Sequence, residues 1–322
     1  MTFARAFAAA LLAVVASAVA GQAQNYPNRN ITAIIPFAAG NANDITARIV
    51  FEQLSKQLGQ AIVIEGRPGA GGTIGVGQAA RAAPDGYTIL FHSATFSASY
   101  VTHKTLPYDT LNDFIAVAPV GISASVLVAA PSKGYKTAAD LIAAAKAKPG
   151  ELNFASAGIG AASHLAAEKF IAAAGIKAQH IPFKGPVEAL AEVMAGRIDF
   201  YFLPIAAALP QVKEGTVRAL AVSSDKRVAS LPDVPTTVEI GLPGAAYAFW
   251  NGTFVPAKTP RDIVEKLHAE HAKAVAVPAV RERMAKMGIE PLVMSQPEFE
   301  KYFKADVLDT EKLAKTAGIE KQ

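Results

Sequence analysis

The sequence predicts a two-lobed α/β protein, in which each lobe is a mainly parallel sheet flanked by helices and the chain crosses between the lobes twice. First, short apolar segments alternate with amphipathic segments of helical period after residue 30. Second, the alternation forms two blocks, separated by a largely apolar stretch at 114–128. Third, an aromatic stretch at 243–256 precedes three helical segments and is expected to return the chain. We therefore expect residues 24–122 and 246–322 to form lobe 1, and residues 123–245 to form lobe 2.

The first 23 residues have the pattern of a secretion signal. A single charge, Arg5, precedes an apolar run at 6–20, and Ala18-Val19-Ala20 and Gly21-Gln22-Ala23 are alternative cleavage sites. The run is shorter than the roughly 20 residues of a membrane span, which disfavours that alternative. The chain has no cysteine for disulfides or for lipid attachment. We expect a freely diffusing protein of a bacterial periplasm, and a monomer.

The charge pattern argues against nucleic acid as a ligand. The formal charge is +4, and it falls to +3 when Arg5 is removed with the signal. Lysine and arginine are interspersed with acidic residues, as at 281–286, and no basic run is interleaved with aromatic residues. A weakly positive surface favours anionic solutes slightly, but solvated helix faces explain the same charges.

The first block contains three strand patterns and two helix patterns. Apolar residues near helical spacing follow Asp44, and the glycine-rich segment 69–72 leads into the second helix. Pro84-Asp85-Gly86 is a turn signal before the third strand. The expected elements are a strand at 31–36, a helix at 44–58, a strand at 61–65, a helix at 74–83 and a strand at 88–92.

The second block and the tail repeat this pattern. Thr137 is expected to cap the first helix of the block, and Gly196 to end the third. The block is expected to contain helices at 138–148, 163–174 and 187–195 and strands at 153–156, 179–182, 198–203 and 217–222. In the tail, Thr259-Pro260 is expected to cap a helix at 261–275, followed by helices at 280–287 and 297–315 that pack on lobe 1. The aromatic residues around Trp250 are expected to pack in the hinge or core rather than to hold a cofactor.

Two loops of small residues each join a strand to a helix, at 36–44 (the first loop) and at 156–164 (the second loop). Such loops aim the unpaired N–H groups and the positive dipole end of a helix at whatever lies beyond them, and an anion is the natural ligand. Asn43 or Asp44 is expected to cap the helix after the first loop, with Arg48 paired to Asp44 one turn later. In the second loop the Ser156 hydroxyl is a candidate donor.

Further candidates lie at other strand ends. His164 either donates to a ligand or orients the second loop, and the supporting role is favoured. Lys184, followed by Gly185, either neutralises a second carboxylate or is simply solvated. Ser93 and Thr95 follow the strand at 88–92 and are expected to add hydroxyl groups on weaker grounds.

Enzyme and cofactor patterns are absent from the sequence. It contains neither a Gly-x-Ser-x-Gly elbow nor an HExxH pair among its six histidines. His268 and His271 share a helix face near Glu265, a pattern more typical of a polar surface than of a metal site. Gly75-x-Gly77-x-x-Ala80 starts inside an expected helix, which argues against a dinucleotide site. We expect no catalysis, no cofactor and no metal, and expect the glycines around Gly72 to let that loop pack at the cleft.

Ten short segments occur in a specific order along the chain. They are Ile35-Pro36-Phe37 with Asp44 and Ala47-Arg48; Gly69-Ala70-Gly71-Gly72; Pro84-Asp85-Gly86-Tyr87-Thr88; Leu106-Pro107-Tyr108-Asp109 before Asp113-Phe114; Pro149-Gly150-Glu151-Leu152; Ser156-x-Gly158-x-Gly160 with His164-Leu165; Lys184-Gly185; Gly196-Arg197-Ile198-Asp199; Arg218-Ala219-Leu220-Ala221-Val222; and Leu231-Pro232-Asp233-Val234-Pro235-Thr236. Together they resemble the substrate-binding receptors of tripartite tricarboxylate transporters, also called Bug or TctC-type solute-binding proteins, along nearly the whole mature chain.

The resemblance implies a periplasmic Venus-flytrap receptor, type II-like, that closes on a small carboxylate and delivers it to a permease of one large and one small membrane subunit. It also implies that backbone amides and ordered water of the two loops hold a di- or tricarboxylate, an amino acid or an aromatic carboxylate. Carried over residue by residue, the expected ligand-binding positions are Phe37, Gly40, Asn41, Asn43 and Asp44, and Ser156, Gly158, Gly160, Ala161 and His164.

Three departures from the family pattern bear on the ligand. Asn41 replaces a frequent glycine, Ala161 replaces a frequent serine or threonine, and Pro186-Val187-Glu188 follows Lys184-Gly185. Two alternative functions stay open at this point. One is an extracytoplasmic sensor that presents its ligand to a signalling kinase, and the other is a periplasmic hydrolase or isomerase on the same scaffold.

Overall fold

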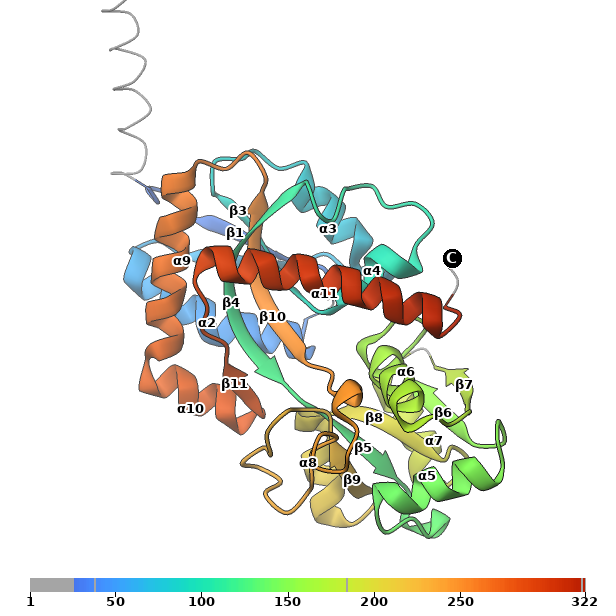
Figure 1. The fold of residues 1–322 in the computed structure, drawn as a ribbon. Helices are drawn as coiled ribbons and strands as arrows, with labels where there is room; N and C mark the ends of the chain where they lie inside the picture. The colour runs from blue at the N-terminus through green and yellow to red at the C-terminus, as the bar shows by residue number, and fades with distance from the viewer. Residues whose placement is uncertain (1–25, 38, 184, 320, 322) are drawn as a thin grey trace, which may run out of the picture.

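The computed structural model describes residues 26–37, 39–183, 185–319 and 321 and contains two lobes, each built on one sheet (Figure 1). The strands are β1 (Ile31–Ile35), β2 (Ile62–Gly66), β3 (Thr88–Ser93), β4 (Phe114–Ser123), β5 (Ser125–Ala129), β6 (Asn153–Ser156), β7 (Gln179–Pro182), β8 (Phe200–Pro204), β9 (Arg218–Val222), β10 (Phe249–Pro256) and β11 (Ile289–Pro291). The first sheet has the order β11-β4-β10-β3-β1-β2 and the second β7-β6-β8-β5-β9. The two-lobed α/β prediction is confirmed, while the predicted signal peptide, 1–23, lies outside the described residues.

Helices cover both sheets. They are α2 (Ala42–Leu58), α3 (Thr73–Ala80), α4 (Thr95–Thr102), α5 (Ala138–Ala147), α6 (Ala162–Ala174), α7 (Pro186–Met194), α8 (Ile205–Glu214), α9 (Arg261–Ala276), α10 (Pro278–Lys286) and α11 (Gln296–Thr316), with short 3-10 turns η2 (Ala70–Gly72), η3 (Pro131–Lys133) and η4 (Pro243–Ala245). The sequence analysis missed α4 and α8. Six of the eight residues of α4 are buried, so it lacks the amphipathic period that indicates a helix, and α8 contains Pro210.

The prediction that each sheet is mainly parallel is confirmed, since only β10 and β11 of the first sheet and β5 of the second run against the other strands of their sheet. β1 pairs in parallel with β2 and β3, and β6 pairs in parallel with β7 and β8. The strands next to the crossings are antiparallel to their neighbours: β10 to β3 and β4, and β5 to β8 and β9. β5 and β10 are buried along nearly their whole length, so they lack the alternation of exposed and buried residues that is typical of an antiparallel strand.

The caps agree with the sequence analysis in one case and differ in two. Thr137 caps α5 in a reciprocal capping box with Asp140, as predicted. α2 is capped by Asn41 rather than by Asn43 or Asp44, because the helix begins two residues earlier than predicted. α9 has no side-chain cap, and the Thr259 hydroxyl donates instead to the Pro256 carbonyl at 2.7 Å.

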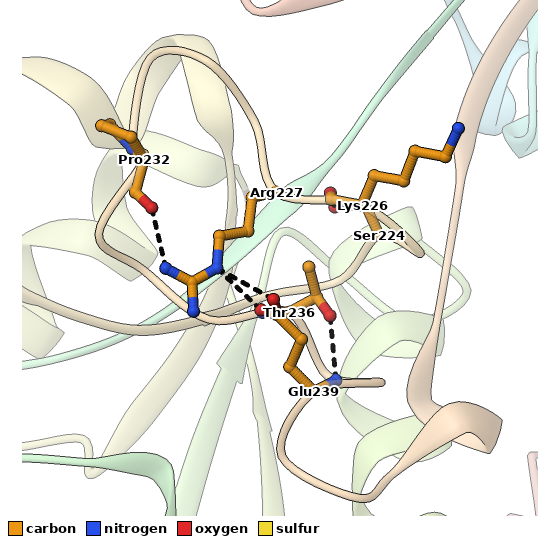
Figure 2. Close-up of polar contacts among 6 residues, drawn as sticks. All are labelled: Ser224, Lys226, Arg227, Pro232, Thr236 and Glu239. Carbon is orange, nitrogen blue, oxygen red and sulfur yellow. Dashed lines mark hydrogen bonds and ion pairs between the residues drawn. The ribbon is translucent and has the colours of Figure 1, made fainter.

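The chain passes from the first sheet to the second at Ala124, between β4 and β5. It returns through residues 223–248, a loop held by its own polar contacts (Figure 2). Arg227 Nε lies 2.9 Å from Glu239 Oε2, and Arg227 Nη1 donates to the Pro232 carbonyl at 2.9 Å. Thr236 and Glu239 bond reciprocally, as in a capping box. The loop therefore has a defined shape where it leads into β10.

The cores of the two lobes are continuous on the side covered by α11. That helix packs on β4 and α4 of the first lobe and also contacts α6 of the second. Trp250 is fully buried against Phe254, Phe299 and Phe303, and its indole N–H donates to Asp306 Oδ2 at 2.9 Å. The prediction that Trp250 serves hinge or core packing is confirmed. Within the described residues no helix has the length and apolar character to cross a membrane.

Acidification from pH 7 to pH 5 is expected to lower the free energy of unfolding through His271. This ring is fully buried; its Nδ1 donates to the Leu267 carbonyl at 2.8 Å, and its Nε2 accepts from Thr253 Oγ1 at 2.9 Å, which requires the neutral form. Burial lowers the pKa of His271 to about 4. Because a histidine in the unfolded chain has a pKa of about 6.5, the unfolded state binds the proton first, and stability falls as the pH drops from about 6.5 to about 4.

Protonation of His271 in the unfolded state is expected to lower the free energy of unfolding by about 2 kcal/mol between pH 7 and pH 5. Urea unfolding of the wild type and of His271→Gln at both pH values measures it. The variant is expected to be less stable at pH 7 but to lose less on acidification. Equal losses in the two proteins would contradict the prediction.

Candidate ligand-binding site

A cavity of about 380 Å³ lies between the lobes, within the size range of small-molecule sites. Lobe 1 lines it with the first loop, η2 and α4, and lobe 2 lines it with the second loop and with residues from β8 and the start of α7. The lining residues are Phe37, Asn41, Ala42, Asn43, Gly71, Thr95, Ser99, Thr102, His103, Ala157, Gly158, Ile159, Gly160, Ala161, Ala162, Ser163, Pro186, Tyr201, Pro204 and Phe249.

Three backbone amides of the first loop, those of Gly40, Asn43 and Asp44, donate to side chains of the loop itself. Asn41 Oδ1 accepts from the amides of Asn43 (2.8 Å) and Asp44 (3.1 Å). Asp44 Oδ2 accepts from the Gly40 amide at 2.8 Å and from Arg48 Nε at 3.0 Å, the predicted i,i+4 ion pair. Burial opposes ionisation of Asp44, but these two hydrogen bonds outweigh it and lower the pKa of the carboxyl. Asp44 therefore stabilises the conformation of the first loop and does not line the cavity.

Ser156 and His164 have the same supporting role in the second loop. Ser156 Oγ accepts from the Gly158 amide at 3.1 Å, donates to the Gly158 carbonyl at 2.9 Å, and lies 2.6 Å from His180 Nε2. His164 Nδ1 accepts from the Gly160 amide at 3.1 Å, and its ring stacks on His180 at 3.8 Å between centroids. Burial, and secondarily His164, lowers the pKa of His180 to about 4, so that ring is neutral near pH 7. Neither Ser156 nor His164 lines the cavity.

The N-terminus of α6 is open to the cavity. Its N-cap residue is Ala161, whose methyl side chain cannot accept a hydrogen bond from the first amides of the helix. The amides of Ala162 and Ser163 have no acceptor among the described residues, and both residues line the cavity. Ser163 Oγ accepts from the Ala157 amide at 3.0 Å, and its hydroxyl lies near that of Tyr201. This helix end therefore presents two unpaired amides and the Ser163 hydroxyl to the cavity, where the dipole favours an anion.

Tyr201 of β8 adds a fourth donor. Its side chain is 0% exposed and lines the cavity, and its hydroxyl lies near the Ser163 hydroxyl but makes no hydrogen bond of normal geometry with a described residue. Burial raises the pKa of Tyr201 to about 12, so the hydroxyl keeps its proton. A buried hydroxyl without a partner costs about 1–3 kcal/mol, which a ligand that accepts its hydrogen bond would recover.

The opposite wall is formed by α4, which the sequence analysis missed. Thr95, Ser99 and Thr102 line the cavity from this helix, and His103 lines it as the C-cap residue. Their spacing of four and then three residues puts the first three on one helix face, and that pattern was available in the sequence. His103 Nδ1 lies 3.2 Å from the Ser99 carbonyl oxygen and donates to it, since a carbonyl only accepts.

The two walls approach each other closely at one point. A Cβ on Gly160, in the second loop, would overlap Cγ2 of Thr102 in α4. The side walls between them are apolar and come from both lobes, with Phe37, Ile159, Pro186, Pro204 and Phe249. The cavity is thus lined by a cluster of hydrogen-bond donors on one side and by apolar side chains on the others. The two lobes are in contact beside it.

The structure brings about half of the predicted site residues to the cavity. Those that line it are Phe37, Asn41, Asn43, Thr95, Gly158, Gly160 and Ala161. Those that lie outside the lining are Gly40, Asp44, Gly72, Ser93, Ser156, His164 and Gly185. Gly71 lines the cavity in place of Gly72, and Lys184 lies outside the described residues. Residues that sequence reasoning missed are Ser163, Tyr201 and His103; β8 was predicted, but nothing in the sequence indicates the Tyr201 hydroxyl.

The histidine pair on α9 is used internally. His268 Nδ1 donates to the Val117 carbonyl at 2.9 Å, His271 is bonded to Thr253, and Glu265 pairs with Arg261 at 2.8 Å. Within the described part of the chain, no group of three or more potential metal ligands is present. The structure gives no support to the metal alternative at this face.

Comparisons with known proteins agree with this architecture. The family described as "Tripartite tricarboxylate transporter family receptor" matches residues 46–319. A relative from Pseudomonas sp. (strain P51), the UPF0065 protein in the tcbD-tcbE intergenic region, is 37% identical over 288 residues, which are 89% of this chain and 86% of the relative. Rpa4515 of R. palustris, solved with adipate, has a TM-score of 0.82 at 30% identity and covers 92% of this chain and 100% of its own. MatC from Rhodopseudomonas palustris, solved with malate, has a TM-score of 0.77 at 30% identity, with coverages of 89% and 99%.

Two sheets with a cavity between them, matched over nearly the whole length by ligand-bound structures, define a two-lobed solute-binding protein. The chain belongs to the tripartite tricarboxylate transporter receptor family, the TctC or Bug type of periplasmic binding protein. The resemblance drawn from ten sequence segments is thereby confirmed.

Proposed function

We propose that this protein is an exported receptor that captures a small carboxylate between its lobes and delivers it to the permease subunits of a tripartite tricarboxylate transporter. The observation that carries the proposal is the open N-terminus of α6, where the amides of Ala162 and Ser163 and the hydroxyls of Ser163 and Tyr201 face one cavity. Export rests on the signal pattern of residues 1–23.

The donor set suits one carboxylate group. A hydrogen bond to a charged group contributes about 1.5–3 kcal/mol net, so three or four donors support micromolar binding, about −8 kcal/mol. Among the described lining residues there is no Asp, Glu, Lys or Arg, so the recognition depends on neutral donors and the helix dipole. The apolar side walls fit the hydrocarbon part of the ligand. Adipate and malate, bound to the two relatives, are carboxylates of this kind.

The mechanism is lobe closure without chemistry. A ligand shifts the equilibrium toward the closed form only by its higher affinity for that form. Donors on lobe 2 and hydroxyls on lobe 1 meet the same ligand only when the lobes are together. Closure would therefore report ligand capture to the permease.

A thermal-shift experiment tests the proposal. The mature protein is heated with adipate, malate, citrate, glutamate and benzoate, and the amide adipamide serves as the control. Ligand at one hundred times its dissociation constant adds about 2.7 kcal/mol to stability, which corresponds to a shift of several degrees in a protein of this size. We expect at least one carboxylate to shift the midpoint and adipamide to leave it unchanged.

No shift with any carboxylate at millimolar concentration would refute the proposal. Recovery of a chemically altered ligand after incubation would instead favour a hydrolase or isomerase. Uptake by proteoliposomes that hold the permease subunits separates transport from sensing, because a receptor for sensing alone would not stimulate uptake.

A further inference from the structure

Four polar side chains form a chain of hydrogen bonds from the interior of the first sheet to the cavity wall. Asn251 Nδ2 donates to Asn43 Oδ1 at 2.6 Å, and Asn43 Nδ2 donates to Ser93 Oγ at 3.2 Å. Ser93 Oγ then donates to Thr95 Oγ1 at 3.3 Å. Asn251 is 2% exposed, Asn43 5% and Ser93 0%, so water competes little for these groups.

The direction of these hydrogen bonds is set by the orientation of the Asn251 amide, whose nitrogen faces Asn43. An amide nitrogen only donates and an amide oxygen only accepts, so the orientation of Asn251 determines that of Asn43. Ser93 receives a proton from Asn43 and has no acceptor other than Thr95 among the described residues. Thr95 therefore accepts from Ser93, and no described residue takes the proton of Thr95 itself. Since Thr95 lines the cavity, its hydroxyl is left to donate to a ligand.

The backbone explains why these residues meet. Asn251 lies directly opposite Ser93 in the antiparallel pairing of β10 with β3. An irregularity in the pairing of β10 with β4 falls between Asn251 and Gly252, at the end of β10 near the cleft. Asn43 belongs to the first turn of α2 and bonds to both strands. The arrangement thus links β3, β10 and α2 beside the cavity.

This series of hydrogen bonds completes a site in which both lobes present donors. Lobe 2 offers the amides of Ala162 and Ser163 and the hydroxyl of Tyr201, and lobe 1 offers the hydroxyl of Thr95. An ionised carboxylate only accepts hydrogen bonds and can satisfy donors from both sides, whereas a carboxamide would place its own NH₂ against one of them.

We infer that Asn251 is a positioning residue that sets the hydrogen-bond polarity of the site, so that the protein selects an ionised carboxylate over the corresponding amide. Asn251 does not line the cavity and acts through Asn43, Ser93 and Thr95. The inference rests on the proposed carboxylate site and adds to it a determinant of specificity. Successive hydrogen bonds in a buried chain polarise one another, which strengthens the last donor.

The decisive variant is Asn251→Asp. An ionised Asp at this position only accepts, so the Asn43 amide must turn round, Ser93 must donate to Asn43, and Thr95 must donate to Ser93. The hydroxyl of Thr95 then offers only lone pairs to the cavity. Titration calorimetry at pH 8 compares adipate with adipamide, malate with malamide, and benzoate with benzamide. We expect the variant to lose at least about tenfold of the wild-type preference for the carboxylate, the effect of one charge-assisted hydrogen bond.

Two further variants keep the test decisive if Asn251→Asp does not fold. Ser93→Ala interrupts the chain, and Thr95→Val removes its last donor while keeping the side-chain shape. Both are expected to lower the carboxylate preference. Thr253→Val is the matched control, because Thr253 is a buried threonine on the same strand that bonds to His271 instead. It is expected to lose stability but to keep the preference.

The outcomes separate the inference from the proposed function. If Thr95→Val lowers the preference while Asn251→Asp and Ser93→Ala keep it, Thr95 donates without help and the inference is wrong. If all variants keep the wild-type preference for the carboxylate, the hydrogen bonds from Asn251 to Thr95 play no part in ligand recognition. If the wild type binds none of the three carboxylates, the proposed function itself fails and the inference fails with it.

Discussion

Replacing Gly160 by alanine is expected to raise the dissociation constant for the ligand at least about tenfold, by hindering lobe closure. Gly160 has φ +73°, and its added methyl group would overlap Thr102 Cγ2 on the opposite lobe. The left-handed backbone costs an alanine about 1–2 kcal/mol whether the lobes are open or closed. The overlap with Thr102 exists only where the lobes touch, and overpacking of this kind costs about 1–3 kcal/mol. Because only the closed form carries this second cost, it subtracts from the binding energy.

A control and a rescue distinguish the two costs. Gly175→Ala has the same kind of strain, with φ +60°, but its methyl group would meet no atom within 4 Å. It is expected to lower the free energy of unfolding and leave the dissociation constant unchanged. Adding Thr102→Ala to Gly160→Ala removes the worst contact and is expected to restore much of the affinity. Unchanged affinity in Gly160→Ala, measured by calorimetry, would show that this contact is not part of the ligand-bound form.

Replacing Tyr201 by phenylalanine is expected to stabilise the ligand-free protein and weaken ligand binding. The Tyr201 hydroxyl is buried and makes no hydrogen bond of normal geometry with a described residue, and an unsatisfied hydroxyl costs about 1–3 kcal/mol, so its removal is expected to add about 1 kcal/mol to the free energy of unfolding. The ligand loses a hydrogen bond to its carboxylate, which corresponds to an affinity about ten to one hundred times lower. Urea unfolding and calorimetry measure the two effects.

Tyr108→Phe is the matched control for this prediction. Its hydroxyl is likewise buried, lies near a serine, Ser99, and makes no hydrogen bond of normal geometry with a described residue, but Tyr108 itself borders a different cavity. It is expected to gain stability with no change in affinity. If Tyr201→Phe binds the ligand as tightly as the wild type, the Tyr201 hydroxyl does not contact it, and the carboxylate must lie elsewhere in the cavity.

Elements that are specified by a few neighbouring residues were predicted correctly from the sequence. β6 and β7 were predicted with the bounds that the structure has, and α5 with the cap that it has, because strand alternation, turn residues and a threonine before a helix act over a few residues. The same local logic found the two loops at the starts of α2 and α6. A helix N-terminus after a strand has unpaired amides whatever the rest of the chain does.

The individual roles within the site depended on partners far away in the sequence. Ser156 and His164 carry suitable donors, but His180 and Gly160 engage them and turn them away from the cavity. Asn43 meets Asn251 across 208 positions, and no spacing rule relates the two. Tyr201 lies on β8, and its hydroxyl is notable only because it makes no hydrogen bond of normal geometry with a described residue.

The sequence by itself therefore determined the family, the two-lobed α/β architecture and the position of two strand–loop–helix segments, because each is encoded in short segments and their order. The tertiary structure alone decided which few strands run against the rest of their sheet, which helix end is open, and which donors reach the cavity. Asn41 caps α2 and closes that end, while Ala161 cannot cap α6 and leaves it open. The physical reason is that a donor is available to a ligand only when no other group has taken it, and that depends on every neighbour in space.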